Sequence, residues 1–353
     1  MERSDEVLFY VGTYSPEIEQ GIRLCTLNRS TGGMRILEGT SGIENPSYLA
    51  VNRAGSVLYA VSEKDEGEVQ AFAIDPESKA LSPLGSIHKT AGGAPCYVSI
   101  SPQEDQLFVS NYSGGNVNVF PINEDGSILE MLAQVRHTGS GSRVDRQEAP
   151  HPHSVIPDST GDRLFVCDLG LDQVVIYRKE ADKLVKQAAV DLPPGSGPRH
   201  LTLHPSGKWA YLINELNNTV TVFTKDEQHG ELTVLQHVST LPESYIAGSD
   251  DSGADIHIAP CGRYLYASNR GHDSIALFLI DALTGLLEPA DWQSTGGRTP
   301  RNFAILGGKL LAANQNSGTI VSFHIDGDNG RLIPTGNELE IPAPVCIKTL
   351  ELE

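Results

Sequence analysis

Arginine, histidine and glutamate side chains occur at two fixed places in a motif that repeats along the chain. Each copy begins with proline and a second residue, runs through two short apolar strands and ends in a polar residue. The clearest copy starts at Pro198-Arg199 and ends at Asn214-Glu215. Arginine can hold a carboxylate or a phosphate through paired hydrogen bonds, and histidine or glutamate can take a proton from water. Together these residue types are suited to acid–base chemistry on a small anionic molecule.

The spacing of the motif predicts the fold. Its copies begin at Pro46, Pro95, Pro152, Pro198, Ala254 and Pro300, so that successive starts are 49, 57, 46, 56 and 46 residues apart. Two further strands complete each unit, and the turn between them has the pattern Asp-x-x-x-Gly-x-Leu, as in residues 281–287. A period near 50 residues with about four short strands per unit is typical of a β-propeller. We therefore predict an all-β protein built from four-stranded antiparallel blades.

The two ends of the chain complete one another. Residues 8–13 form an apolar segment with no inner strand before it, and residues 344–350 match the inner-strand pattern with nothing after them. Pairing the C-terminal strand with the N-terminal blade would close the ring and remove an exposed sheet edge. The prediction is one seven-bladed propeller domain over residues 1–353.

The hairpin geometry of each blade predicts where the reactive side chains meet. In an antiparallel pair, the start of the first strand lies beside the end of the second, so both places belong to the same rim of the channel. Polar groups that crowd one mouth of a channel with apolar walls are expected to form a ligand site. The pairs expected there are Ser47 with Glu63, Cys96 with Asn111, His153 with Asp168, Arg199 with Glu215, Asp255 with Arg270, and Arg301 with Gln315.

The charge balance narrows the class of ligand. The chain has 26 basic and 45 acidic residues, a formal net charge of −19, which disfavours nucleic acid as a partner. A rim that gathers Arg199, Arg270 and Arg301 in so acidic a protein points to a small anionic ligand. The alternative is that these arginines only form ion pairs with neighbouring carboxylates.

Composition also bears on compartment and cofactors. No apolar run approaches about 20 residues, and the start of the sequence is polar, so neither a membrane span nor a signal peptide is expected. The five cysteines are widely spread, which favours buried thiols in a reducing compartment. We expect a cytoplasmic monomer. His151 and His153 lack a nearby third ligand, so no metal or other cofactor is expected.

Several segments resemble a known family, the seven-bladed propeller lactonases of the bacterial cytosolic 6-phosphogluconolactonase type, to which fungal carboxy-cis,cis-muconate cyclase is related. The matching segments are residues 150–155, 197–201, 213–216, 268–275 and 313–316. The resemblance implies that His153, Arg199, Glu215 and Arg270 form the functional cluster. The sequence departs from the repeat at Ala254, which replaces proline, and at a shortened hairpin over residues 306–309, which could displace Arg301.

The cationic rim and the signs of a cytosolic protein, together with the resemblance, predict hydrolysis of 6-phosphogluconolactone, and no metal is needed because arginines can supply the electrostatics. His153 or Glu215 would activate water, and Arg199 would stabilise the developing oxyanion. Arg270 and Arg301 would hold the phosphate, and Asn111 and Gln315 complete the expected substrate-binding set. Two alternatives stay open at this point: a cycloisomerase acting on a carboxymuconate, and a non-catalytic propeller that binds a ligand or partner.

Overall fold

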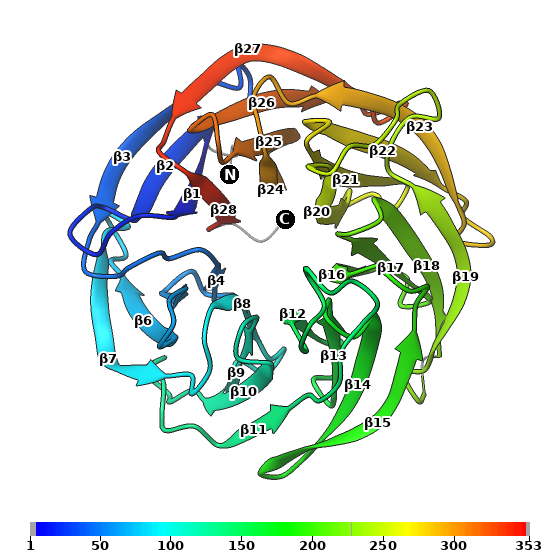
Figure 1. The fold of residues 1–353 in the computed structure, drawn as a ribbon. Coiled ribbons are helices and arrows are strands. Elements are labelled where there is room, and N and C mark those ends of the chain that lie inside the picture. Colours follow the sequence, from blue (N-terminus) through cyan, green and yellow to red (C-terminus); the bar gives the residue numbers. More distant parts are fainter. Residues whose placement is uncertain (1–4, 227, 351–353) are drawn as a thin grey trace.

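Seven antiparallel sheets of four strands each surround a common axis (Figure 1). The computed structural model describes residues 5–226 and 228–350, and these residues form 28 strands and no helix. The innermost strands of the sheets face the axis and the outermost strands form the perimeter. This confirms the predicted seven-bladed propeller.

The strands are given from the innermost to the outermost of each sheet. Three sheets comprise β28 (Pro344–Thr349), β1 (Glu6–Thr13), β2 (Ile22–Asn28) and β3 (Met34–Thr40); β4 (Leu49–Val51), β5 (Val57–Ser62), β6 (Glu68–Ile74) and β7 (Leu81–Lys89); and β8 (Pro95–Ile100), β9 (Gln106–Asn111), β10 (Asn116–Pro121) and β11 (Ala133–Arg136). The other four comprise β12 (Pro152–Pro157), β13 (Arg163–Asp168), β14 (Gln173–Glu180) and β15 (Lys183–Asp191); β16 (Pro198–Leu203), β17 (Trp209–Asn214), β18 (Thr219–Lys225) and β19 (Leu232–Ser239); β20 (Ser252–Ile258), β21 (Tyr264–Arg270), β22 (Ser274–Ile280) and β23 (Leu287–Ser294); and β24 (Pro300–Leu306), β25 (Lys309–Asn314), β26 (Thr319–Ile325) and β27 (Leu332–Glu340).

The ring is closed by the pairing that the two chain ends predicted. Strand β28 pairs antiparallel with β1, with Val11 opposite Ile347 and Gly12 opposite Cys346. The C-terminal strand, red in Figure 1, therefore becomes the innermost strand of the blue N-terminal blade. Closure in this way leaves every inner strand hydrogen-bonded and ties residues more than 300 positions apart into one sheet.

The apolar core lies between neighbouring blades. One cluster joins Tyr211 and Ile213 of β17 to Leu265 of β21 and Phe278 of β22, all buried. Because the strands in the middle of each blade are covered on both faces, they read as almost continuous apolar runs, such as Val57–Ser62, instead of alternating ones. The packing of one blade against the next thus holds the channel rim in shape.

A tyrosine hydroxyl links several blades to the next blade in the chain. Tyr10, Tyr59, Tyr211 and Tyr266 each occupy the second strand of a blade and donate to a backbone carbonyl in the outer hairpin of the neighbouring blade. Tyr211 donates to Gly285 at 2.9 Å and Tyr266 to Gly330 at 2.7 Å. Gly285 has φ +74°, the left-handed conformation that the glycine of the repeated turn motif supplies.

Tyr211→Phe is expected to lower the free energy of unfolding by about 1–3 kcal/mol, because it leaves the Gly285 carbonyl without its buried donor. The measurement is urea unfolding followed by circular dichroism. Tyr245→Phe is the control: it also removes a hydroxyl hydrogen bond, to Asp251 at 3.1 Å, but Tyr245 is 37% exposed, so water can replace the lost donor and the cost should be smaller than for Tyr211→Phe. Equal losses of stability in the two variants would show that the buried bond between blades contributes no more than an exposed one.

The prediction of buried thiols is confirmed at four of the five cysteines. All five are free thiols; Cys25, Cys96, Cys167 and Cys346 are buried. Cys261 is exposed, so the expectation of buried thiols is wrong there, because it lies in the turn between β20 and β21. None of the described residues builds a helix of the length and apolar character that crossing a membrane would require.

Candidate active site

A β-bulge at the start of the inner strands positions the reactive side chains. In β12, Pro152 pairs with Asp168 and Ser154 with Cys167, so His153 is the extra residue. The same irregularity makes Cys96, Arg199 and Arg301 the extra residues of β8, β16 and β24. A bulge bends the strand and re-aims a side chain that a regular strand would direct at the neighbouring blade. The repeated Pro-x motif is therefore the sequence of the bulge.

The bulges and the ends of the second strands enclose a pocket of about 360 Å³ over one mouth of the channel. It lies on the rim that hairpin geometry predicted. The lining residues are Tyr14, Glu63, Cys96, Tyr112, Arg146, His153, Glu215, Ser252, Arg270 and Arg301. Three arginines face two glutamates there, so the pocket has an excess of positive charge within an acidic protein.

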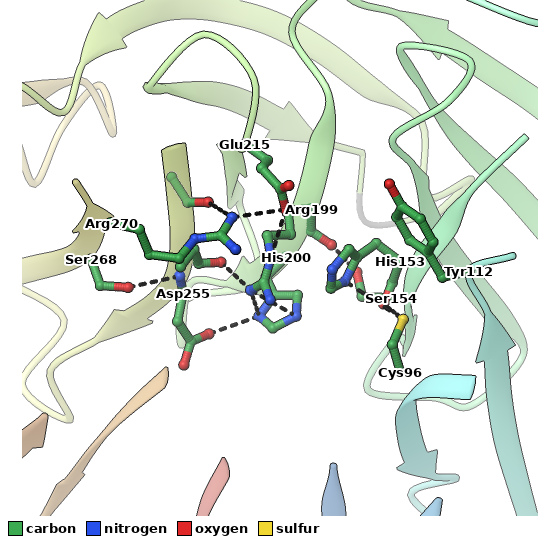
Figure 2. A network of polar contacts seen from close by, with 12 residues as sticks. Cys96, Tyr112, His153, Ser154, Arg199, His200, Glu215, Asp255, Ser268 and Arg270 are labelled. Atoms are coloured by element: carbon green, nitrogen blue, oxygen red, sulfur yellow. Dashed lines mark hydrogen bonds and ion pairs between the residues drawn. The ribbon is translucent and has the colours of Figure 1, made fainter. Parts of the chain in front are cut away.

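Glu215 is the centre of an arginine cluster (Figure 2). Its Oε2 accepts from Arg199 Nε and from Arg270 Nη2, both at 3.0 Å, and its Oε1 accepts from Arg146 Nη2 at 2.5 Å. Burial alone would raise the pKa of this carboxyl, but the attraction of Arg270 and Arg199 outweighs it and holds the pKa well below its usual range. Glu215 is therefore a buried anion and a weak base.

Arg199 lies behind Glu215 and is not among the residues that line the pocket. Its side chain is 3% exposed, and its Nη1 donates to the backbone oxygen of Ala254. Figure 2 shows its guanidinium between Glu215 and the ring of His200. The structure thus places Arg199 beneath the pocket, with its Nε bound to Glu215 and its Nη1 to the Ala254 carbonyl.

Arg301 has the opposite surroundings. It lines the pocket with its guanidinium carbon 5.3 Å from the centre of the Tyr14 ring, a cation–π contact. Tyr14 donates its hydroxyl to Glu63 at 2.9 Å. Across residues 5–226 and 228–350, no hydrogen bond or ion pair engages the Arg301 guanidinium. The short β24–β25 hairpin leaves Arg301 on the same rim as the other bulge residues, with its donors available to a ligand.

His153 is one of the residues that line the pocket. Its Nδ1 is 3.8 Å from Cys96 Sγ, and its ring meets the Tyr112 ring edge-on at 5.7 Å. Burial, together with the positive charge of Arg199, holds the pKa of this imidazole well below its ordinary value. His153 is therefore neutral at pH 7, with a ring nitrogen that can accept a proton.

The structure gathers most of the predicted site residues but separates two of them. His153, Glu215, Arg270 and Arg301 line one pocket. Asn111 is buried, and its amide donates to Asn118 within its own blade. Gln315 is half-buried at the end of β25, and neither side chain is part of the pocket lining.

The sequence motif missed Arg146, Tyr112, Tyr14 and Ser252, which also line the pocket. Arg146 comes from the connection of residues 137–151 between β11 and β12, and Ser252 follows the connection of residues 240–251. These two connections account for the long repeat spacings of 57 and 56 residues. The signal in the sequence was that two repeats are longer than the other spacings of 46 to 49 residues, because each carries a long connection on the rim of the site. Buried Gln147 anchors the first loop by donating to Leu169 O and Asp172 Oδ1.

The chemistry that this pocket offers is acid–base and electrostatic. It combines a neutral histidine, a carboxylate fixed by arginines and an arginine with unused donors. Among the described residues, no three His, Cys, Asp or Glu side chains are placed to hold a metal ion together. A neutral base beside preorganised cations is suited to opening an ester-like bond in an anionic molecule.

Comparison with known proteins identifies the class. The family model described as "Lactonase, 7-bladed beta-propeller" matches residues 8–349. A Bacillus subtilis protein named 6-phosphogluconolactonase is 35% identical over 97% of both chains. The solved structure of a Bacteroides fragilis protein superposes with a TM-score of 0.91 at 36% identity, covering 99% of each chain. That of a Pseudomonas aeruginosa periplasmic gluconolactonase gives 0.89 at 32% identity, covering 99% of this chain and 100% of that one.

The fold and the pocket thus define a propeller enzyme of the lactone-hydrolysing class. The chain belongs to the seven-bladed β-propeller lactonase family, and it is a lactonase. The resemblance stated from sequence motifs is confirmed, and the non-catalytic alternative is set aside. The expected cytoplasmic location stays a prediction, since one structural relative is described as periplasmic.

Proposed function

We propose that this lactonase hydrolyses 6-phosphogluconolactone to 6-phosphogluconate. The observation that carries the proposal is Arg301, a pocket-lining arginine whose donors no described residue engages. A guanidinium fork of this kind matches the oxygens of a phosphate. The Bacillus subtilis relative named for this activity supports the same substrate.

In this mechanism His153 is the general base. Glu215 was the other candidate, but arginines hold both of its oxygens. Their attraction outweighs the effect of burial and lowers the pKa of the carboxyl, so Glu215 accepts a proton poorly. A water molecule gives a proton to the open ring nitrogen of His153, and its oxygen adds to the lactone carbonyl.

Arg270 stabilises the oxyanion that forms at the carbonyl. We assign this role to Arg270 instead of Arg199 because Arg270 lines the pocket, whereas Arg199 lies beneath Glu215. Glu215 orients both guanidinium groups. The tetrahedral intermediate then expels the ring oxygen, which takes the proton from His153, and a carboxylic acid and a hydroxyl result. The arginines supply the electrostatics, so the reaction proceeds without a metal.

The test is a lactonase assay on freshly generated 6-phosphogluconolactone, with spontaneous hydrolysis subtracted and with EDTA present. Rapid hydrolysis unaffected by EDTA supports the proposal. A rate at background overturns it, and a rate abolished by EDTA overturns its metal-independent mechanism. A carboxymuconate tested in parallel examines the cycloisomerase alternative.

An unphosphorylated gluconolactone is the second candidate substrate. The Pseudomonas aeruginosa structure is named as a gluconolactonase and shares 32% identity with this chain, so the fold accommodates a neutral sugar lactone in a relative. The two candidates differ in whether Arg301 has a phosphate to bind, which makes Arg301 the residue to vary.

Arg301→Ala is expected to raise KM for the phosphorylated lactone by about 10- to 100-fold, because a charge-assisted contact is lost. The KM for gluconolactone should change little. Arg298→Ala is the matched control, since Arg298 is exposed three residues earlier and does not line the pocket. Equal effects of Arg301→Ala on the two lactones would contradict the phosphate role.

A further inference from the structure

A second polar layer lies directly beneath the pocket. Asp255 and His200 belong to β20 and β16, and His200 Nδ1 lies 2.8 Å from Asp255 Oδ1 (Figure 2). Both residues are buried, at 1% and 5% exposure, and neither is among the residues that line the pocket. Sequence analysis placed Asp255 on the rim with Arg270, whereas the structure places it beneath the reactive groups.

Asp255 is a fully engaged carboxylate. Its Oδ1 also accepts from Ile256 N at 3.0 Å, and its Oδ2 accepts from Asn302 Nδ2, from Phe303 N and from the His257 ring. A buried carboxylate with this many donors remains ionised. Burial alone would raise its pKa, but the interactions with His257 and His200 lower the pKa by more. The ionised Asp255 requires the proton of neutral His200 to reside on Nδ1.

His200 contacts both groups on which the proposed chemistry depends. Arg199 Nη1 lies 3.5 Å from one ring nitrogen of His200 and 3.4 Å from the other, so it sits over the ring. The His153 ring meets the His200 ring at 5.2 Å and 70°. The His200 ring also packs edge-on against Tyr97, at 5.2 Å, and against Tyr48, at 5.8 Å.

We propose that Asp255 and His200 are positioning residues of the lactonase site. Asp255 fixes the tautomer and orientation of His200. The His200 ring then supports Arg199, which holds Glu215, and His153, which takes the proton. Asp255 is also, with Glu215, one of two carboxylates whose negative charge attracts the buried Arg199 guanidinium. A displacement of about 1 Å in such a constellation costs roughly 100-fold in rate.

Asp255→Asn is the first variant, because it removes the charge with almost no change in shape. The asparagine amide can donate to His200, which then places its proton on Nε2. We expect kcat to fall by roughly 100-fold with little change in KM. His200→Gln keeps the Asp255 charge but removes the supporting ring, and we expect the same direction.

The control is Asp158→Asn. Asp158 is also buried, lies at the end of the β12–β13 hairpin away from the pocket, and pairs with Arg163 at 3.6 Å. Substitution of a carboxylate that has only a structural role should lower the thermal midpoint without changing the kcat of the folded fraction. If Asp255→Asn and His200→Gln behave in the same way as Asp158→Asn, the positioning role is overturned.

The acid limb of kcat/KM provides a second kinetic readout. The charged and titratable groups that face His153 are Cys96 from β8, Tyr112 after β9, Arg199 and His200 from β16, Glu215 after β17 and Arg301 from β24. Loss of the Asp255 charge makes the surroundings of His153 more positive, which lowers the pKa of its imidazole. The acid limb should therefore move to lower pH. It should not move in Asp158→Asn, and an unmoved limb in Asp255→Asn counts against the proposal.

The kinetic readouts rest on the proposed function, so one measurement is independent of it. Histidine labelled with ¹⁵N reports ring tautomers by NMR, and the His200→Gln spectrum identifies the His200 signal. Wild type should show the Nδ1–H form of His200, and Asp255→Asn should change both the His200 tautomer and the His153 resonances. Unchanged His153 resonances would overturn the proposal even if 6-phosphogluconolactone proved not to be the substrate.

Discussion

Glu215→Gln is expected to destabilise the fold by about 3–5 kcal/mol and to abolish most of the lactonase activity. The carboxylate accepts from Arg146, Arg199 and Arg270, and it is 4% exposed. A neutral amide would leave the guanidinium groups of Arg199 and Arg270, which are 3% and 13% exposed, without their shared counter-charge. Their mutual repulsion would then displace Arg270 from the position in which it can stabilise an oxyanion.

Urea unfolding and thermal midpoints measure the loss of stability, and assays corrected for the folded fraction measure the loss of activity. Glu63→Gln is the matched control, because Glu63 lines the same pocket but accepts from the Tyr14 hydroxyl instead of from arginines. It should cost about 1 kcal/mol. Equal destabilisation by the two substitutions would mean that the arginine cluster contributes no special stability.

The pH dependence of this stability has a definite sign. The folded-state pKa of Glu215 lies below its unfolded value, because arginine attraction exceeds the penalty of burial. Its contribution is therefore fully present above about pH 4.3 and is lost as the pH falls from there toward the folded-state value. The difference between wild type and Glu215→Gln should narrow over that acid range and stay constant above it.

The ring could be predicted from sequence because its pattern is local and repeated. A short apolar hairpin after each Pro-x pair, such as that from Pro198 to Asn214, is sufficient to place the rim, and the unmatched ends near Val11 and Ile347 are sufficient to close the ring. These features follow from strand alternation and turn chemistry, which neighbouring residues determine.

The depth of each side chain on that rim could not be predicted. The bulges at Arg199 and Arg301 are equivalent in sequence, yet one arginine is buried under Glu215 and the other faces the pocket. What separates them is the neighbouring blade: Arg199 donates to the Ala254 carbonyl of the next blade, whereas Arg301 lies against the Tyr14 ring of the next blade. Such contacts are between elements far apart in the chain, so a motif within one blade carries no information about them.

The loop that delivers Arg146 illustrates the same limit. Its position depends on buried Gln147, which holds the backbone near Leu169 and the carboxylate of Asp172. The repeat spacing locates the insertion between β11 and β12, but nothing in the loop's own sequence indicates that Arg146 turns inward to Glu215. Loops are fixed by tertiary hydrogen bonds of this kind, which strand periodicity cannot predict.

His153→Gln is expected to lower kcat by about 100- to 10,000-fold without a comparable loss of stability, because the proposed general base is removed. Glutamine is close to histidine in length and can retain a polar contact in the space beside Cys96 and Tyr112. The measurement is the steady-state rate on the phosphorylated lactone after subtraction of the spontaneous reaction. His151→Gln is the control, since His151 stacks on Tyr112 from the same segment but does not line the pocket.

The pH profile separates His153 from Glu215 as the base. Burial and the neighbouring Arg199 lower the pKa of His153, so the neutral, proton-accepting form persists below the usual value of about 6.5. Wild-type kcat/KM should therefore be flat through neutral pH and fall only on the acid side of that value. In His153→Gln this acid limb should disappear together with the activity. A variant that keeps more than about a tenth of the wild-type rate, with its acid limb in place, would transfer the role of base to Glu215, since a single general base contributes at least about 100-fold.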